Sequence, residues 1–256
     1  MKYEGLVIHK TPYKERDLIV KILLRSGTLT SLYFYGGQGG GKRKKGSQLE
    51  LGHMLSIETA PRKSSLDESM LVAKEWKLLW GPEHIRYDYK AYYFLSFICE
   101  LTAKLSQAES EYDDFKEIFI VTSNALFELE KSVKEKTFSL DLQIFRYLIK
   151  LSQALGICPD FKHCLYCYED LSESGLLFFE APNGGFSCQS CHQEESLSGE
   201  HSRHLQQSAL KTLQTKFSDE LDIEIRNREG KEFFHYLCFQ LGMQTQNFKT
   251  YTLNFN

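Results

Sequence analysis

The stretch Leu18-Ile-Val-Lys-Ile-Leu-Leu24 decides the fold of the N-terminal part of the chain. It is a short apolar run with β-branched residues, a pattern that predicts a mostly buried β-strand. A similar run, Gly5-Leu-Val-Ile-His9, precedes it. The segment between them, Thr11 to Asp17, contains a proline and several charged residues and predicts a turn. The chain is therefore expected to begin with two paired strands.

Three further strands are predicted before residue 80. Thr28 to Tyr35 is rich in Thr, Tyr and Phe, and His53 to Ala60 and Met70 to Trp76 follow it. Five short strands in so short a segment indicate a small barrel, because closing the sheet removes exposed edges. We predict an OB-type β-barrel over residues 1–80, with an SH3-like barrel as the alternative.

The hydrophobic period changes after Gly81-Pro82. Pro82 suits the first position of a helix, and apolar residues recur at helical spacing from Ile85 to Leu101. Asp113-Asp114 predicts the start of a second helix. Three more helices are predicted over 140–155, 202–217 and 231–243. The sequence thus predicts an α+β protein whose all-α domain, residues 81–256, carries one irregular insert at about 157–199.

The composition is that of an ordinary globular protein. The chain has 256 residues, 42% of them hydrophobic and 25% charged. No apolar run approaches the roughly 18 residues of a membrane span, and Met1 to Glu4 lacks the apolar segment of a secretory signal. We therefore expect a cytoplasmic protein without membrane contact. Its seven cysteines are then expected to be thiols or metal ligands rather than disulfides.

Four of the cysteines form the pattern C-x2-C…C-x2-C, with twenty residues between the pairs. They are Cys164, Cys167, Cys188 and Cys191. Two such knuckles supply four sulfurs for one tetrahedral zinc, and because every ligand comes from protein the site should be structural. An iron–sulfur cluster or a redox dithiol is the alternative. Substitute ligands lie nearby, although four cysteines already complete the shell: His163, His192 and Cys158.

Charge is distributed unevenly along the chain. Residues up to Leu66 carry 12 Lys and Arg against five acidic residues, a net charge of +7, so the remainder carries −10 of the total of −3. A basic module on an acidic body is the electrostatic pattern of a polyanion-binding domain. Charge needed only for solubility is the alternative explanation.

A glycine-rich loop, Gly36 to Gly46, contains four consecutive cations: Lys42, Arg43, Lys44 and Lys45. The loop matches a phosphate-binding P-loop only up to Lys42, because Arg43 stands where Ser or Thr would bind magnesium. We therefore exclude a nucleotide triphosphatase. A cationic loop of this kind suits tracking of a nucleic-acid backbone, since Lys and Arg displace condensed counterions without distinguishing base sequence.

Side chains near this loop are candidates for further nucleic-acid contacts. Tyr33 and Tyr35 should share one face of their strand and are expected to stack on bases, while Phe34 faces the core. Covering the barrel is the alternative role for both tyrosines. Arg16 in the preceding turn is expected to extend the surface, unless it lies in an ordinary solvated turn. The sequence lacks G-x-S-x-G and H-E-x-x-H motifs, so we expect no enzyme.

Three stretches together resemble the bacterial RecO family of DNA repair proteins. Residues 4–20 are similar to its opening strand, turn and second strand, and the basic loop followed by Gln48 to Leu51 is similar to its basic segment. Leu155-Gly-Ile157, the two knuckles, Phe178 and Gly184-Gly185 are similar to its zinc module. The likeness covers nearly the whole chain. The departure from the family pattern is the unusually glycine-rich stretch 36–41.

The resemblance implies a recombination mediator associated with the nucleoid. RecO-like proteins bind single- and double-stranded DNA and anneal complementary strands coated with single-stranded DNA-binding protein (SSB). With RecR they help RecA replace SSB, and their helical domain takes the SSB C-terminal tail. The competing interpretation is a zinc-ribbon, RNA-binding adaptor of the transcription or translation machinery. Annealing of SSB-coated DNA separates the two, because an RNA-binding adaptor has no reason to promote it.

Overall fold

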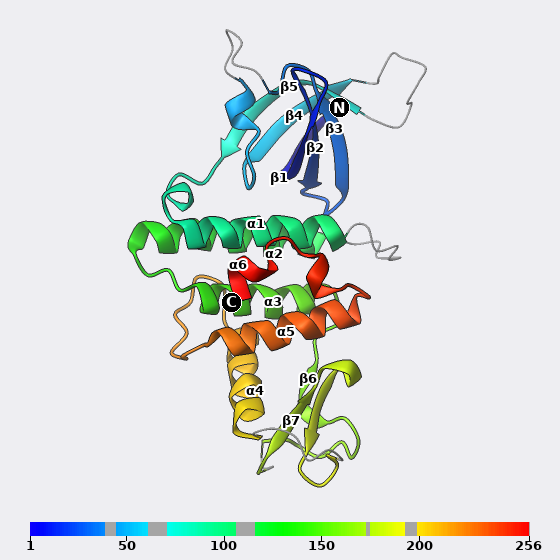
Figure 1. Ribbon diagram of the computed structural model, residues 1–256, viewed down its shortest axis with the longest axis vertical. Helices are drawn as coiled ribbons and strands as arrows, with labels where there is room; N and C mark the ends of the chain where they lie inside the picture. Colours follow the sequence, from blue (N-terminus) through cyan, green and yellow to red (C-terminus); the bar gives the residue numbers. More distant parts are fainter. Residues whose placement is uncertain (39–44, 61–70, 106–115, 173–174, 193–198, 256) are drawn as a thin grey trace. The chain divides into compact units, whose positions relative to one another are not determined.

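The computed structural model describes residues 1–38, 45–60, 71–105, 116–172, 175–192 and 199–255 (Figure 1). The chain divides into two compact units, Met1–Phe138 and Ser139–Asn256, and each is described by itself. The first unit holds more than the predicted barrel, because two helices that follow the last strand belong to it. Within the described ranges, no helix has both the length and the apolar character that a membrane crossing requires.

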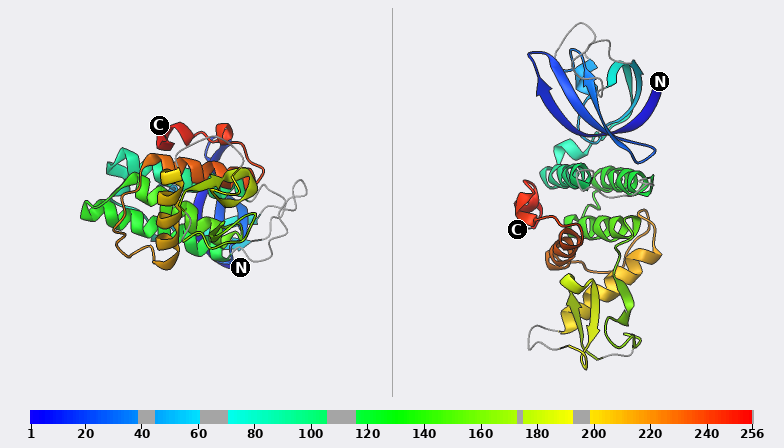
Figure 2. Two further views of the ribbon diagram at one scale, coloured as in Figure 1. Left: turned by 90° about the horizontal axis from the view of Figure 1, so that it is seen from below. Right: turned by 90° about the vertical axis from the view of Figure 1, so that its right-hand side faces the viewer.

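The first unit begins with a closed five-stranded barrel (Figures 1 and 2). Its strands are β1 (Lys2–Tyr13), β2 (Asp17–Leu24), β3 (Leu29–Phe34), β4 (Met54–Ala60) and β5 (Leu71–Trp80). The order around the barrel is β1-β2-β3-β5-β4, β1 also pairs with β4, and β3 and β5 run parallel. This confirms the predicted OB-type barrel. A short 3-10 helix, η1 (Lys45–Gln48), precedes β4.

Alternation along the strands builds the barrel core. On β2, Leu18, Val20 and Ile22 are buried, as period-two alternation requires. Phe34 on β3 is fully buried, and its ring packs edge-on against Trp76 with centroids 5.0 Å apart. The predicted orientation of Phe34 toward the core is therefore confirmed.

The turn between β1 and β2 is shorter than predicted. The sequence indicated a turn over Thr11 to Asp17, but β1 continues to Tyr13, which pairs with Asp17, and only residues 14–16 connect the strands. Pro12 is tolerated because β1 pairs with β4 only over Lys2–Leu6, which leaves the far half of β1 with one partner strand. Tyr13 therefore lies on a strand rather than in a loop.

Two helices complete the first unit, and the chain enters them later than predicted. After a 3-10 turn, η2 (Ile85–Tyr87), come α1 (Tyr89–Leu105) and α2 (Lys116–Glu135). Pro82 therefore does not begin a helix, and the carboxylate of Asp88 accepts a hydrogen bond from the backbone N–H of Ala91 at the start of α1 (3.0 Å). The predicted helix start at Asp113-Asp114 lies outside the described residues.

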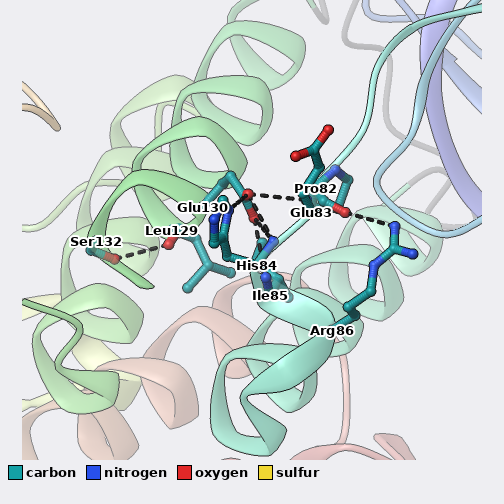
Figure 3. A network of polar contacts seen from close by, with 8 residues as sticks. All are labelled: Pro82, Glu83, His84, Ile85, Arg86, Leu129, Glu130 and Ser132. Carbon is teal, nitrogen blue, oxygen red and sulfur yellow. Dashed lines mark hydrogen bonds and ion pairs between the residues drawn. The ribbon is translucent and has the colours of Figure 1, made fainter. Parts of the chain in front are cut away.

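The delayed start of α1 is explained by Glu130 on α2 (Figure 3). Its carboxylate accepts hydrogen bonds from the backbone N–H groups of Glu83 (3.0 Å), His84 (2.9 Å) and Ile85 (3.1 Å). The ring Nδ1 of His84 lies 2.6 Å from the same carboxylate. Burial acts to raise the pKa of Glu130, but these hydrogen bonds outweigh it and lower the pKa. The carboxylate thus binds the backbone N–H groups at the start of η2, ahead of α1.

The second unit combines helices with a small sheet. Its elements are α3 (Leu140–Ala154), β6 (Asp160–Cys164), β7 (Leu177–Glu180), η3 (Ala181–Asn183), β8 (Gly185–Cys188), α4 (Gly199–Gln214), α5 (Asn227–Gln240), η4 (Thr245–Asn247) and α6 (Tyr251–Phe255). The sheet has the order β6-β8-β7 and lies within the predicted insert. Gly156, predicted to end the third helix, has a positive φ of 69° just after α3. The short α6 was not predicted.

An aromatic core joins the sheet to the helices of the second unit. The ring of Phe233 on α5 lies 6.4 Å from Phe161 on β6 and 6.4 Å from Phe179 on β7. The side-chain amide of Gln206 on α4 donates a hydrogen bond to the backbone carbonyl of Phe161 (2.6 Å). The sheet therefore shares its core with α4 and α5 and is part of the packed unit.

We predict that Glu130→Ala lowers the free energy of unfolding by about 2 kcal/mol at pH 7, because it leaves the N–H groups of residues 83–85 without their acceptor. Since folding lowers the pKa of Glu130, its contribution is present above the ordinary glutamate pKa and is lost as pH falls through the folded value. Urea unfolding from pH 7 down to below about 4.3 should show the difference from wild type shrinking. Glu117→Ala, an exposed change on α2, is the control. A difference that does not change with pH would contradict the assignment.

Candidate metal centre and nucleic-acid interface

The four predicted cysteine ligands lie together at one end of the small sheet. Cys164 ends β6 and Cys188 ends β8, and these strands are parallel neighbours. Cys167 and Cys191 follow in the two knuckles. The four sulfur atoms all lie within 4.8 Å of one another, and in the described part of the chain this group includes no histidine. The predicted clustering of the four thiols is confirmed.

The sulfur geometry fits one tetrahedral metal ion. Cys167 Sγ and Cys188 Sγ are 3.8 Å apart, much farther than the roughly 2.05 Å of a disulfide. Metal–sulfur bonds of about 2.3 Å at tetrahedral angles place neighbouring sulfurs about 3.8 Å apart. In the second knuckle, the backbone N–H of Cys191 donates to the carbonyl of Cys188 (3.1 Å), which closes the tight turn that brings both thiols to one point.

Electrostatics around the sulfurs also favour a bound cation. Burial acts to raise the pKa of Cys164, but hydrogen bonds from the backbone N–H groups of Cys167, Cys188 and Tyr166 outweigh it and lower the pKa to about 6. The neighbouring sulfurs of Cys188 and Cys167 instead raise the pKa of Cys191 to about 12. One thiolate therefore forms readily, and a divalent metal would supply the charge needed to deprotonate the others. With four protein ligands, no coordination position would remain for water.

The substitute ligands considered from the sequence have other partners or lie outside the group. His163 Nδ1 is 2.9 Å from the carboxylate of Asp160. The ring of His192 stacks on Phe178, with centroids 3.7 Å apart and planes inclined by 2°. Cys158 is not among the four clustered thiols. The four-cysteine set is therefore the arrangement best suited to a metal.

The barrel brings Arg16 next to the beginning of the glycine-rich loop. Arg16 is exposed in the β1–β2 turn, and its backbone carbonyl accepts a hydrogen bond from the N–H of Gln38 (2.9 Å). The side-chain amide of Gln38 donates to the carbonyl of Asp17 (2.7 Å). These contacts fasten the entry of the loop to the turn that carries Arg16.

Three tyrosine rings form a cluster beside this turn, and the structure corrects the role expected of one of them. Tyr33 is only 3% exposed, and its hydroxyl donates a hydrogen bond to the Asp17 carboxylate. Its ring therefore offers little face for a base. Tyr35 is 60% exposed, and its ring centroid lies 4.6 Å from that of Tyr33. Of the two, Tyr35 is placed where a base could stack.

Tyr13 is the member of the cluster that the sequence analysis missed. It is 40% exposed, its ring lies 5.5 Å from that of Tyr33, and the ammonium of Lys14 lies 5.5 Å above it. Its pairing with Asp17 directs it to this surface, a position hidden by the prediction of a turn over residues 11–17. Extending the alternation of the first strand by four residues would have found it.

Asp17 links the tyrosine cluster to the loop. The carboxylate accepts the Tyr33 hydroxyl at one oxygen and the backbone N–H of Gly36 at the other (2.8 Å). The hydrogen bond from the Tyr33 hydroxyl, and after it the one from the Gly36 N–H, lower the pKa of Asp17 below its ordinary value. The charged carboxylate thus fixes both the supporting ring and the residue at which the glycine-rich segment begins.

The cationic run itself is mostly beyond what the structure describes. Lys42, Arg43 and Lys44 lie outside the described residues, and Lys45 is described only as the first residue of η1. Among the described cations of the barrel, the ammonium of Lys10 pairs with the Glu50 carboxylate (2.5 Å). Contacts of the four cations with nucleic acid therefore stay a prediction.

Comparison with known proteins gives consistent matches. The family model described as "Recombination protein O C terminal" matches residues 86–225, more than half of the chain. A "DNA repair protein RecO" of Thermodesulfovibrio yellowstonii is 28% identical over 188 residues, which cover 73% of this chain and 68% of that protein. A "DNA repair protein RecO" of Bacillus mycoides is 29% identical over 196 residues, covering 76% and 71% respectively.

We predict one zinc ion per chain, measured by elemental analysis of the purified full-length protein. Cys164→Ser should remove most of the metal and lower the thermal stability of the second unit, because the remaining three thiols cannot complete the tetrahedral shell. Cys158→Ser, outside the cluster, should keep a full zinc content. Iron in place of zinc, or a Cys164→Ser protein that keeps its metal, would contradict the assignment.

Proposed function

Because the chain belongs to the RecO family, we propose that it is a DNA repair and recombination mediator that binds single- and double-stranded DNA and anneals complementary strands. The observation that carries the proposal is the surface at one end of the barrel, where exposed Arg16, Tyr13 and Tyr35 adjoin the entry of the cationic loop. We call this the turn surface. Residues 1–80 are then the nucleic-acid-binding domain, and residues 81–256 form the helical domain with its metal module.

The charge distribution supports the turn surface as the DNA site. Residues up to Leu66 carry a net charge of +7, and the 12 cations behind this charge include the four consecutive ones of the loop. Lys and Arg release condensed counterions from phosphates and so bind any sequence. Neutralising two strands lowers their mutual repulsion, which is what annealing requires. No covalent bond is made or broken in this process, so the protein acts without a catalytic centre.

The aromatic rings add binding energy for unpaired bases. Bases stacked on aromatic side chains contribute about 1–3 kcal/mol each, largely without regard to sequence. Tyr35 and Tyr13 supply the exposed faces, and Tyr33 supports them from beneath. Because bases in a duplex are already stacked and paired, this contribution belongs to single strands.

The metal module has a different role in this proposal. Zinc bound by Cys164, Cys167, Cys188 and Cys191 would stabilise the second unit as a structural ion. Residues 157–199 carry seven acidic residues against one lysine, a charge that repels phosphates. We therefore assign DNA binding to the barrel rather than to the module.

The resemblance to the RecO family also supports a proposal for the protein partners. We propose that the chain acts with RecR to help RecA replace SSB on gapped DNA, and that its helical domain, residues 81–256, takes the acidic, apolar C-terminal tail of SSB. These interactions would bring the annealing surface to strands that SSB already covers.

The experiment that tests the function measures annealing of complementary, SSB-coated DNA strands. Fluorescence quenching reports the rate of annealing, with and without RecR. The proposal expects the full-length protein to accelerate annealing of DNA. The competing function, a zinc-ribbon adaptor that binds RNA, expects binding to structured RNA and no acceleration. Absence of annealing together with tight RNA binding would overturn the proposal.

We predict that changing Lys42, Arg43, Lys44 and Lys45 together to Ala flattens the salt dependence of single-strand binding. Each lost phosphate contact should reduce the slope of log K against log salt by about 0.7 to 0.9, so four contacts reduce it by roughly three. Fluorescence anisotropy across a salt series measures the slope, and unrelated sequences should weaken equally. The charge-matched control changes four exposed lysines elsewhere: Lys131, Lys134, Lys211 and Lys216. An unchanged slope in the loop variant would show that DNA lies elsewhere.

We also predict that Tyr35→Ala weakens single-strand binding by about 1–3 kcal/mol and duplex binding much less, since only unpaired bases can stack on the exposed ring. Tyr13→Ala should act in the same direction. Titration of labelled single strands and duplexes at one salt concentration measures both affinities. Tyr87→Ala, a substitution of a tyrosine that is 85% exposed outside the barrel, is the control. Equal losses for single strands and duplex would contradict a stacking role.

A further inference from the structure

Glu180 at the end of β7 contacts the first cysteine knuckle. The hydroxyl of Tyr166, which immediately precedes Cys167, donates a hydrogen bond to Glu180 Oε2 (2.5 Å). The side-chain amide of Asn183 donates to the same oxygen (2.8 Å) and to the Tyr166 hydroxyl (3.1 Å). One carboxylate oxygen thus holds the side chain that lies between the two thiols of the first knuckle.

The same carboxylate faces the second knuckle. His192 immediately follows Cys191, and its Nδ1 lies 3.6 Å from Glu180 Oε1 and 3.5 Å from the hydroxyl of Ser187. Its ring stacks on Phe178, which lies two residues before Glu180 and so shares its face of β7. This face therefore receives a residue from each knuckle.

The Glu180 and His192 side chains are half-buried, whereas Tyr166 lies at the surface. The side chains of Glu180 and His192 are 16% and 12% exposed. Burial acts to raise the pKa of Glu180, but hydrogen bonds from Ser187, Tyr166, Asn183 and His192 outweigh it and lower the pKa. A half-buried charge with this many partners has a defined position, because a displacement would break several hydrogen bonds at once.

We propose that Glu180 is a positioning residue of the metal site, which joins the two knuckles and keeps their four thiols at metal-binding separation. The inference rests on the proposed metal. Glu180 acts on the thiols through Tyr166, whose hydroxyl it binds. The backbone N–H groups of Tyr166 and Cys167 in turn donate to the Cys164 sulfur. Residues that hold metal ligands through hydrogen bonds change metal affinity by about 10- to 100-fold when they are replaced. Glu180 accordingly slows the loss of the metal.

The test makes the same change, Tyr to Phe, at two positions: one within the first knuckle and one directly after it. Tyr166→Phe removes only the hydroxyl that contacts Glu180, whereas Tyr168→Phe removes the hydroxyl of a tyrosine that is 78% exposed. Transfer of zinc from the full-length protein to a colorimetric chelator is followed over time. We expect Tyr166→Phe and Glu180→Gln to accelerate release by about ten-fold and Tyr168→Phe to leave it unchanged.

The outcomes separate the inference from the metal assignment. Equal release rates for wild type, Tyr166→Phe and Glu180→Gln would overturn the positioning role. The thermal stability of Glu180→Gln is measured both with zinc bound and after chelator treatment. An equal loss of stability in the two forms would also overturn the positioning role, because that role concerns the zinc-loaded site. A chain that takes up neither zinc nor Co²⁺, judged by thiolate-to-cobalt absorption, would contradict the metal site itself and the inference with it.

Discussion

The turn surface depends on the Asp17 carboxylate. Its two oxygens accept the Tyr33 hydroxyl and the Gly36 N–H, while its backbone carbonyl accepts the Gln38 amide. The β1–β2 turn, the end of β3 and the first residues of the glycine-rich segment are thereby joined at one residue. These contacts fix Gly36 and Gln38, at the start of the glycine-rich segment, to the β1–β2 turn. The carboxylate keeps the start of that segment beside the exposed rings.

The two units use charge in opposite ways. The N-terminal segment up to Leu66 is basic, as a site for an external polyanion requires, whereas the cysteine module gathers four sulfur atoms in a group suited to an internal cation. The aromatic core of Phe161, Phe179 and Phe233 connects that module to α5, so the order of the metal site and the packing of the second unit support each other. The proposed nucleic-acid site and the proposed metal site thus belong to different units of the chain.

Features encoded by local patterns were predictable from the sequence. The apolar, β-branched run at residues 18–24 predicted a barrel strand, and the spacing of the cysteines within each knuckle predicted the thiol cluster, because both patterns can be read directly from the chain. The roles of Tyr33, Glu130 and Glu180 depend on partners 14 to 46 residues away. Such contacts follow from strand register and helix packing, which one sequence does not specify. Burial of Tyr33 is the clearest example. Alternation placed its ring on the same face as Tyr35, but it did not show that the rings of Tyr13 and Tyr35 would cover it.

The central claim is that DNA lies on the turn surface of the barrel. Photocrosslinking of the full-length protein to a single strand containing 4-thiothymidine, followed by mass spectrometry of the peptides, tests it most directly. The account predicts crosslinks in the peptides that contain Tyr13, Arg16, Tyr35 and the cationic loop. Crosslinks confined to residues 139–256 would contradict it.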